Sequence, residues 1–300
     1  MQTRRLGKDG PLVSVIGFGA WPIGGGLGAV DRSTSIRTVQ SALDAGITMV
    51  DTAEGYRDSE AILGEALAHG YREKCFLATK ASSDFTRKGI RGAIERSLRA
   101  LRVDYVDLYQ IHGWNPAVPV EESMEEMARL RDEGKTRHIG VSNFGPEHMA
   151  RALKIAPFQS NQVRYSMLFR EIEDGTIEYC EKQGIGIIVH SPLAKGLLTG
   201  AYTASSRFAA DDERSGFKDF SGPLFELHLE KAQKISQIAA RKGMSLVQLA
   251  IAWTLLRPVV SCTLVGAKNP TQVKEHVRAS ACPAITTAEC EEIDRILAEA

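Results

Sequence analysis

Eight short apolar runs alternate with amphipathic stretches along this chain, and that alternation limits the folds it can adopt. Runs of about four to eight residues rich in β-branched side chains indicate buried strands, whereas apolar residues spaced three and four apart indicate helices. The expected strands are residues 15–20, 47–53, 75–80, 106–112, 136–142, 158–163, 186–191 and 261–266. The expected helices are residues 33–45, 59–68, 86–101, 120–133, 146–155, 174–183, 229–257 with a break near Gly243, and 270–279.

Eight strand–helix units in about 265 residues predict an α/β protein with the (β/α)8 TIM barrel fold, whose usual size is roughly 250 residues. Glycine follows several of the expected helices, as at Gly46, Gly134 and Gly184, where the chain must turn left-handed before the next strand. Two segments fall outside the repeats. Residues 1–12 are expected to form a hairpin that plugs the barrel bottom, and residues 286–300 an extra C-terminal helix.

Composition favours one domain that spans residues 1–300. Hydrophobic residues make up 43% of the chain and charged residues 25%, which supports one large core, and no segment is long enough to be a linker between domains. The net charge of +0 and the lack of a basic run argue against a nucleic-acid partner. A monomer and a homo-oligomer are both compatible with this pattern.

The cysteines and the apolar runs bear on the compartment. The five cysteines are odd in number and lack Cys-x-x-Cys spacing, so we expect them to be reduced. No apolar run reaches the ~20 residues that cross a bilayer, and the N-terminus lacks the apolar core of a signal peptide. We therefore expect a cytoplasmic protein with no membrane partner.

Four polar residues stand where early strands meet the following helices: Asp51, Tyr56, Lys80 and His112. A phenol titrates near pH ~10 and a lysine near ~10.4 in water, so neither is a useful acid at neutral pH until a neighbour shifts its pKa. An ammonium lowers the pKa of a nearby phenol, a carboxylate keeps the ammonium charged, and an imidazole can hold the reacting oxygen. Together these residue types predict a tyrosine acid that acts on a carbonyl.

Each of these residues also has an ordinary structural interpretation, as a helix cap, a solvated lysine or a core histidine. Their shared position favours the functional one, because every strand C-terminus of a parallel barrel opens on the face that carries the active site. A metal-dependent barrel hydrolase is the rival interpretation. We find no His-x-His or His-Glu-x-x-His pattern, so no metal site is expected.

Seven motifs in order resemble the aldo-keto reductase family over nearly the full chain. They are Gly17-Phe18-Gly19-Ala20-Trp21, Asp51-Thr52-Ala53-x-x-Tyr56, the strand ending at Lys80, Asp107-Leu108-Tyr109-Gln110-Ile111-His112, Gly140-Val141-Ser142-Asn143-Phe144, Asn161-Gln162-Val163 and the run from Ser191 to Gly200. Members similar to this chain are bacterial and plant reductases and the potassium-channel β-subunit group. The resemblance implies that an aldehyde or ketone is reduced to an alcohol, with a nucleotide-sensing regulatory subunit as the alternative.

The resemblance also assigns roles to residues. Tyr56 would protonate the carbonyl oxygen as hydride arrives from a nicotinamide, Lys80 and Asp51 would tune it, and His112 would orient the substrate. Residues that would bind the cofactor are Gly19, Ala20, Trp21, Asp51, Ser142, Asn143, Gln162, His190, Ser191, Pro192, Leu193, Lys195, Gly196, Leu197, Gly266, Ala267, Lys268, Gln272, Glu275 and His276. Within that set, Ser142, Asn143 and Gln162 would meet the carboxamide. The run that begins at Ser191 would wrap the pyrophosphate, and the positions from Gly266 would meet the adenosine end.

Three positions depart from the family pattern. His190 stands where relatives often place a tyrosine under the nicotinamide, so its charge would make cofactor binding depend on pH. Gln272 replaces an arginine that often grips the 2′-phosphate, and His276 an asparagine that often reads adenine. Lys268 is then the nearest cation for that phosphate, so NADP(H) is favoured and NAD(H) is possible.

The predicted substrate pocket combines Trp21, Tyr56, His112 and Trp114. Its aromatic walls suit an uncharged or aromatic aldehyde, although either tryptophan could instead pack a loop. Residues 202–223 form a long charged loop, a length common among lids and binding loops.

Overall fold

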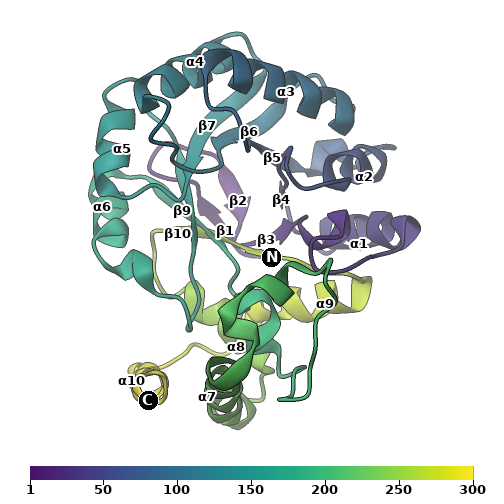
Figure 1. The fold of residues 1–300 in the computed structure, drawn as a ribbon, viewed down its shortest axis with the longest axis vertical. Helices are drawn as coiled ribbons and strands as arrows, with labels where there is room; N and C mark the ends of the chain where they lie inside the picture. Colours follow the sequence, from purple (N-terminus) through teal and green to yellow (C-terminus); the bar gives the residue numbers. More distant parts are fainter. Residues whose placement is uncertain (300) are drawn as a thin grey trace.

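The computed structural model describes residues 1–299, in which eight parallel strands close into a barrel (Figure 1). The strands follow chain order around the barrel, and the last pairs with the first. They are β3 (Ile16–Gly19), β4 (Met49–Asp51), β5 (Phe76–Ala81), β6 (Val106–Ile111), β7 (Thr136–Ser142), β8 (Ser160–Arg164), β9 (Gly186–His190) and β10 (Val260–Val265). The predicted TIM barrel is confirmed, and each observed strand overlaps the run that predicted it.

Helices surround the barrel as the amphipathic stretches predicted. They are α1 (Arg32–Asp44), α2 (Ser59–Ala66), α3 (Arg87–Leu101), α4 (Val120–Asp132), α5 (Pro146–Leu153), α6 (Thr176–Gln183), α7 (Gly222–Arg241), α8 (Leu246–Thr254), α9 (Pro270–Arg278) and α10 (Thr287–Ala298). Within residues 1–299, no helix combines the length and apolar character needed to span a membrane.

One helix start was predicted too late. The stretch 229–257 is two helices that part at Gly243, as expected, but α7 already begins at Gly222, in the segment predicted to be loop. Its first turn contains Pro223, which fits a helix start because the missing N–H would have no partner there. The extra C-terminal helix is confirmed as α10. It begins with a capping box between Thr286 and Glu289. Ala300, the last residue of the predicted segment, lies outside the described residues.

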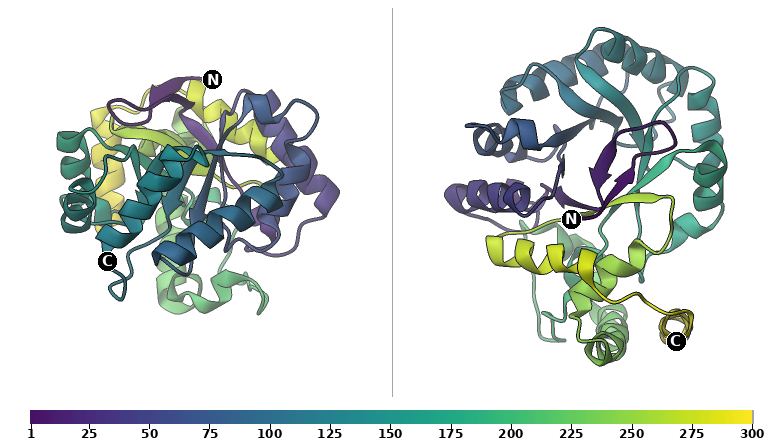
Figure 2. Two further views of the ribbon diagram at one scale, coloured as in Figure 1. Left: turned by 90° about the horizontal axis from the view of Figure 1, so that it is seen from above. Right: turned by 180° about the vertical axis from the view of Figure 1, so that it is seen from behind.

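A hairpin of β1 (Thr3–Arg5) and β2 (Leu12–Ser14) closes the N-terminal end of the barrel, as predicted (Figure 2). Its Leu6 and Val13 are fully buried against inward-facing residues of the lower barrel. Gly7 permits this close approach, because it has a φ of 72° and a Cβ there would stand 2.6 Å from a backbone oxygen of Gln159. That end is therefore filled by apolar side chains.

The barrel interior changes from apolar to polar along four of the strands. Successive residues on one face of a strand are two apart. Each apolar residue of the lower layer is therefore followed, two positions later, by the residue directly above it. Met49 is followed by Asp51, Ala78 by Lys80, Leu108 by Gln110 and Ile188 by His190. The strand C-termini thus carry buried polar groups above an apolar, plugged floor.

Candidate active site

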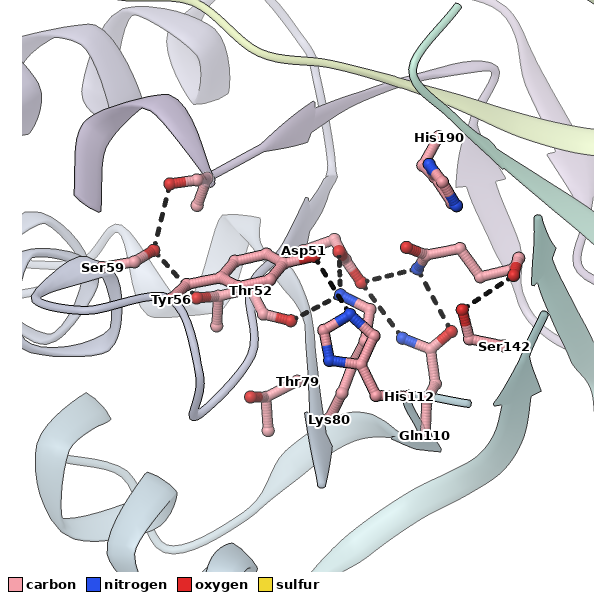
Figure 3. A network of polar contacts seen from close by, with 12 residues as sticks. Asp51, Thr52, Tyr56, Ser59, Thr79, Lys80, Gln110, His112, Ser142 and His190 are labelled. Atoms are coloured by element: carbon pink, nitrogen blue, oxygen red, sulfur yellow. Dashed lines mark hydrogen bonds and ion pairs between the residues drawn. The ribbon is translucent and has the colours of Figure 1, made fainter. Parts of the chain in front are cut away.

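The four residues predicted to act on a carbonyl meet at the C-terminal end of the barrel (Figure 3). Asp51 ends β4, Lys80 lies near the end of β5, and His112 follows β6 directly. Tyr56 comes from the loop after β4 and points back over the barrel mouth. Because β4, β5 and β6 are neighbours in the barrel, the residues at their C-terminal ends lie close together.

Lys80 and Asp51 form a buried ion pair beneath the mouth. Nζ of Lys80 donates to Oδ1 of Asp51 at 2.5 Å and to the carbonyl oxygen of Thr52 at 2.7 Å. The side chains are only 0% and 3% exposed. Burial alone would lower the pKa of Lys80, but the charge of Asp51 and the adjacent Tyr56 outweigh it and raise that pKa above its ordinary value. The ammonium is therefore a fixed positive charge at neutral pH.

Tyr56 lies between that ammonium and two aromatic side chains. Nζ of Lys80 is 4.9 Å from the centre of the Tyr56 ring, and Trp21 stands edge-on with ring centres 4.8 Å apart. Burial raises the pKa of Tyr56, and Lys80 opposes that rise, as the sequence predicted. Burial is the larger effect, so the pKa lies above its usual value and not below it. At neutral pH the hydroxyl holds its proton, which a proton donor requires.

His112 stands across from that hydroxyl. Its Nε2 is 3.4 Å from the Tyr56 oxygen, and its Nδ1 is 2.8 Å from Oγ of Ser82. Burial, followed by the positive charge of Lys80 and by His190, lowers the pKa of His112 to about 3. The imidazole is therefore neutral, and its two nitrogens take opposite hydrogen-bonding roles.

The second oxygen of Asp51 is held by two glutamines. Nε2 of Gln110 donates to Oδ2 at 3.0 Å, and Nε2 of Gln162 donates to the same oxygen at 2.9 Å. Gln162 also donates to Oε1 of Gln110 at 3.3 Å. The prediction from sequence omitted Gln110 from the site, although its position two residues before His112, on the same side of the strand, was a signal that its side chain joins the polar layer.

The residues predicted to meet a nicotinamide carboxamide lie next to this network. Oγ of Ser142 donates to the carbonyl oxygen of Gln162 at 2.8 Å, and Nδ2 of Asn143 donates to the carbonyl oxygen of His112 at 3.2 Å. Asn143 has a φ of 58°, a left-handed conformation that asparagine tolerates. Both amide hydrogens of Gln162 are donated to Asp51 and Gln110. Its Oε1 can therefore accept a hydrogen bond from a ligand at the barrel mouth.

His190 ends β9 beside these residues. Its Nε2 is 3.4 Å from Oδ1 of Asn143, and its Nδ1 is 3.1 Å from Oγ of Ser191. Burial, with Lys80, Lys195 and Arg164 adding positive charge nearby, lowers the pKa of His190 to about 3. The expected pH dependence of cofactor binding stays a prediction, and the lowered pKa moves its transition below neutral pH.

Comparison with known proteins decides what this arrangement belongs to. The aldo/keto reductase family matches residues 15–298. This chain belongs to the aldo/keto reductase family. Aldo-keto reductase YhdN of Bacillus subtilis is 38% identical over 288 residues, which cover 91% of this chain and 87% of that protein. The NADH-specific methylglyoxal reductase of Escherichia coli is 32% identical over 302 residues, which cover 91% and 92%.

Solved structures agree with the sequence relatives. The glycerol dehydrogenase AKR11B4 from Gluconobacter oxydans superposes with a TM-score of 0.89 at 34% identity, covering 99% of this chain and 94% of that one. The holo form of the aldo-keto reductase AKR11C1 from Bacillus halodurans gives a TM-score of 0.80 at 28% identity, covering 99% and 96%. Aldo-keto reductases are carbonyl-reducing oxidoreductases that use nicotinamide cofactors, and this chain is one of them.

In this aldo-keto reductase, the segment predicted to wrap a pyrophosphate has unusual backbone geometry. Ser191, Ala194, Lys195 and Gly196 all have positive φ, from 47° to 106°. Left-handed residues within a tight turn direct successive N–H groups to one side, and such concave backbone binds anions. The φ of 106° at Gly196 favours glycine, and a Cβ there would also stand 2.3 Å from the Tyr202 hydroxyl.

The loop 202–223 closes over this segment and contacts the chain after β3. Oε1 of Glu213 accepts hydrogen bonds from Lys195 Nζ at 2.5 Å and from Trp21 Nε1 at 2.9 Å. Arg214 pairs with Asp212 and donates to the carbonyl oxygen of Leu27. Three aromatic rings of the loop pack against one another and against Phe225 of α7, namely Tyr202, Phe208 and Phe220. The predicted binding loop therefore bridges two sides of the barrel mouth.

The residues predicted for the adenosine end separate into two groups. Lys268 and Gln272 lie at the entry to α9, where Oε1 of Gln272 accepts from the Lys268 backbone N–H at 2.7 Å and Nζ of Lys268 contacts the carbonyl oxygen of Leu27. Glu275 instead accepts from Oγ of Ser245 at 2.8 Å, which holds it toward α8. His276 is buried, and burial lowers its pKa to about 4.

The two tryptophans of the predicted pocket have different surroundings. Trp21 lies against Tyr56, whereas Trp114 stacks on His148 of α5 with ring centres 4.2 Å apart and meets Phe144 edge-on. The contacts of Trp114 thus tie a loop to α5. Among residues 1–299, no group of three or more His, Cys, Asp or Glu is placed to hold one metal ion.

Proposed function

We propose that this protein reduces aldehyde or ketone carbonyls to alcohols with NADP(H), and that Tyr56 is the general acid. The observation that carries the proposal is the contact of Tyr56 with both Lys80 and His112 above the buried Lys80–Asp51 pair. A protonated phenol, a fixed ammonium and a neutral imidazole at one point match the demands of protonating an oxygen that gains negative charge.

The residues at the mouth fit a nicotinamide cofactor. Oε1 of Gln162 and the side chains of Ser142 and Asn143 offer hydrogen-bonding groups for a carboxamide. The left-handed backbone after β9 and the first turn of α9 offer N–H groups for phosphate. When bound, the cofactor supplies the hydride.

The protein's own part is binding and proton transfer. His112 and Tyr56 would hold the substrate oxygen, and the Tyr56 hydroxyl would give its proton to that oxygen as the carbonyl carbon is reduced. Lys80 would then stabilise the phenolate left on Tyr56, because the ammonium lies against the ring. Asp51 keeps the ammonium in place, and Gln110 and Gln162 keep Asp51 in place.

The preference for NADP(H) over NAD(H) depends on Lys268. Lys268 lies in the connection between β10 and α9, where the adenosine end is expected, and its Nζ contacts the carbonyl oxygen of Leu27. A cation there favours a 2′-phosphate. The E. coli relative named as NADH-specific shows that members of this family differ in cofactor.

An activity panel tests the proposal. Aldehydes, ketones and sugars would be offered with NADPH and with NADH, and the absorbance of the reduced nicotinamide followed. We expect turnover of one or more carbonyl classes and a higher kcat/KM with NADPH. Binding of both cofactors without turnover of any carbonyl would favour the nucleotide-sensing alternative, although none of the relatives named above is described as a regulatory subunit.

A further inference from the structure

Ser82 contacts the catalytic histidine from the side away from Tyr56. It follows β5, two residues after Lys80, and its Oγ lies 2.8 Å from Nδ1 of His112. The pairing of β5 with β6 sets this contact, because the backbone N–H of His112 donates to the carbonyl oxygen of Ala81 at 3.0 Å. The serine is therefore held beside the imidazole by the barrel register.

The hydrogen position on His112 decides where the Tyr56 proton points. In a neutral imidazole one nitrogen donates and the other accepts. With hydrogen on Nδ1, the Nε2 atom would accept the proton of Tyr56 across their 3.4 Å contact and turn it away from the substrate. With hydrogen on Nε2, His112 donates into the pocket, and the Tyr56 proton is left for the substrate oxygen.

The contacts of Ser82 favour the second arrangement. The N–H of Gly55 points at Oγ of Ser82 from 3.4 Å, so the hydroxyl already accepts a hydrogen bond. Among residues 1–299, Nδ1 of His112 is the one acceptor within hydrogen-bonding distance of that hydroxyl's own hydrogen. A serine that donates to Nδ1 satisfies every group, whereas one that accepts from it leaves its own hydrogen without a protein partner.

The loop that carries Tyr56 keeps Ser82 in this orientation. Oε1 of Glu54 accepts from the backbone N–H of Ser82 at 2.9 Å, and Arg96 holds the other carboxylate oxygen at 2.8 Å. A Cβ on Gly55 would stand 3.1 Å from Cβ and 3.2 Å from Oγ of Ser82, so the glycine provides the space for this approach. Ser82 thus contacts both the loop of the acid and the histidine.

We propose that Ser82 is a positioning residue that donates its hydroxyl hydrogen to Nδ1 of His112, which keeps the imidazole hydrogen on Nε2 and leaves the Tyr56 proton for the substrate oxygen. The inference rests on the proposed function in one respect, the role of Tyr56 as acid. The tautomer itself is a property of the free protein and can be measured without any turnover.

The first test is histidine NMR on the full chain labelled with ¹⁵N-histidine. Two-bond ¹H–¹⁵N correlations distinguish the tautomers, and His112→Asn assigns the signal. We expect Nε2–H in the parent and in Ser82→Thr, and a mixture of tautomers in Ser82→Ala. A parent protein with hydrogen on Nδ1, or a Ser82→Ala variant with an unchanged Nε2–H signal, would overturn the proposal.

The second test separates positioning from simple loss of structure. Ser82→Ala should lower kcat roughly two- to tenfold, the range that the net free energy of one hydrogen bond gives, with the KM for the cofactor unchanged. Ser82→Thr should recover part of the loss, and Ser83→Ala, at an exposed neighbouring serine, should behave as the parent. Equal kcat values in the alanine and parent proteins would contradict the role in proton delivery. If the parent reduces no carbonyl but shows the Nε2–H signal, the proposed function is overturned and the tautomer assignment stays supported.

Discussion

The two halves of the barrel mouth are organised in different ways. Around Asp51 and Lys80, polar groups on adjacent strands bond to one another in the barrel interior, and each of these groups is buried. Around Lys195 and Lys268, the cationic side chains come from connecting segments, and their partners are Glu213 and the carbonyl oxygen of Leu27. The first half is complete in itself. In the second half, the lysine ammonium groups that would bind a phosphate are already hydrogen-bonded to other groups of the protein.

This difference separates chemistry from affinity. The groups that support the proton donor, Asp51, Lys80, Gln110 and Gln162, lie on strands and are fixed by buried hydrogen bonds, and Tyr56 reaches them from the loop after β4. Cations that attract a phosphate tolerate a looser arrangement, because they can exchange one partner for another. We therefore expect substitutions in the first half to change folding stability and turnover, and substitutions in the second half to change cofactor affinity.

Lys80→Met tests the first half and should have the largest effect. It leaves the Asp51 carboxylate buried without its cation, and breaking a buried pair in this way costs about 3–5 kcal/mol of unfolding free energy. Lys74→Met is the matched control, because Lys74 also pairs with an aspartate, Asp44, at 3.0 Å but with both side chains 52% exposed. The control should lose less than ~1 kcal/mol in urea denaturation. Similar losses in the two variants would show that the buried network does not stabilise the fold.

Lys268→Ala tests the second half. If its ammonium meets a 2′-phosphate, the variant should bind NADPH about fivefold more weakly and NADH about as well as the parent. This loss is smaller than that of a fully buried charged hydrogen bond because the Lys268 side chain is only partly buried. Lys274→Ala, at an exposed lysine of α9, the helix that follows Lys268, is the control. Titration of each cofactor by fluorescence measures the ratio. An equal loss of affinity for both cofactors would show that another residue binds the 2′-phosphate.

His190→Tyr probes the boundary between the halves, and its effect should be confined to acid pH. The folded pKa of about 3 lies below the unfolded value of ~6.5, so the neutral ring stabilises the fold fully above ~6.5, and this contribution is lost as the pH falls toward 3. Tyrosine removes it. The slope of unfolding free energy against pH between ~6.5 and ~4 should fall by less than the ~1.4 kcal/mol per unit that one full proton gives. An unchanged slope would mean that His190 is not protonated on unfolding in this range.

Much of the fold and of the first half could be predicted from sequence. The alternation of short apolar runs with amphipathic stretches identified every barrel strand. The positions of Asp51, Lys80 and His112 at strand ends placed them on one face of the barrel. The hairpin plug and the extra helix were also predicted. Local patterns were sufficient because strand order in this barrel follows chain order.

Other features depend on contacts that a sequence does not display. The position of Gln110 indicated that it faces the polar layer, but its bond to Asp51 and the bond of Ser82 to His112 are visible only once the strands are paired. The pKa of Tyr56 depends on how deeply it is buried, and burial there outweighs Lys80. The contact of Glu213 with Trp21 joins residues 192 positions apart, which no local pattern predicts.

The measurement that tests the central claim most directly is the pair of constants for Tyr56→Phe. The change removes one hydroxyl and leaves the ring between Lys80 and Trp21. We predict that NADPH binds with the parent's affinity, while kcat for carbonyl reduction falls by at least the ~10²-fold typical of lost general acid catalysis. Near-normal kcat in this variant would contradict the account and remove Tyr56 from the mechanism.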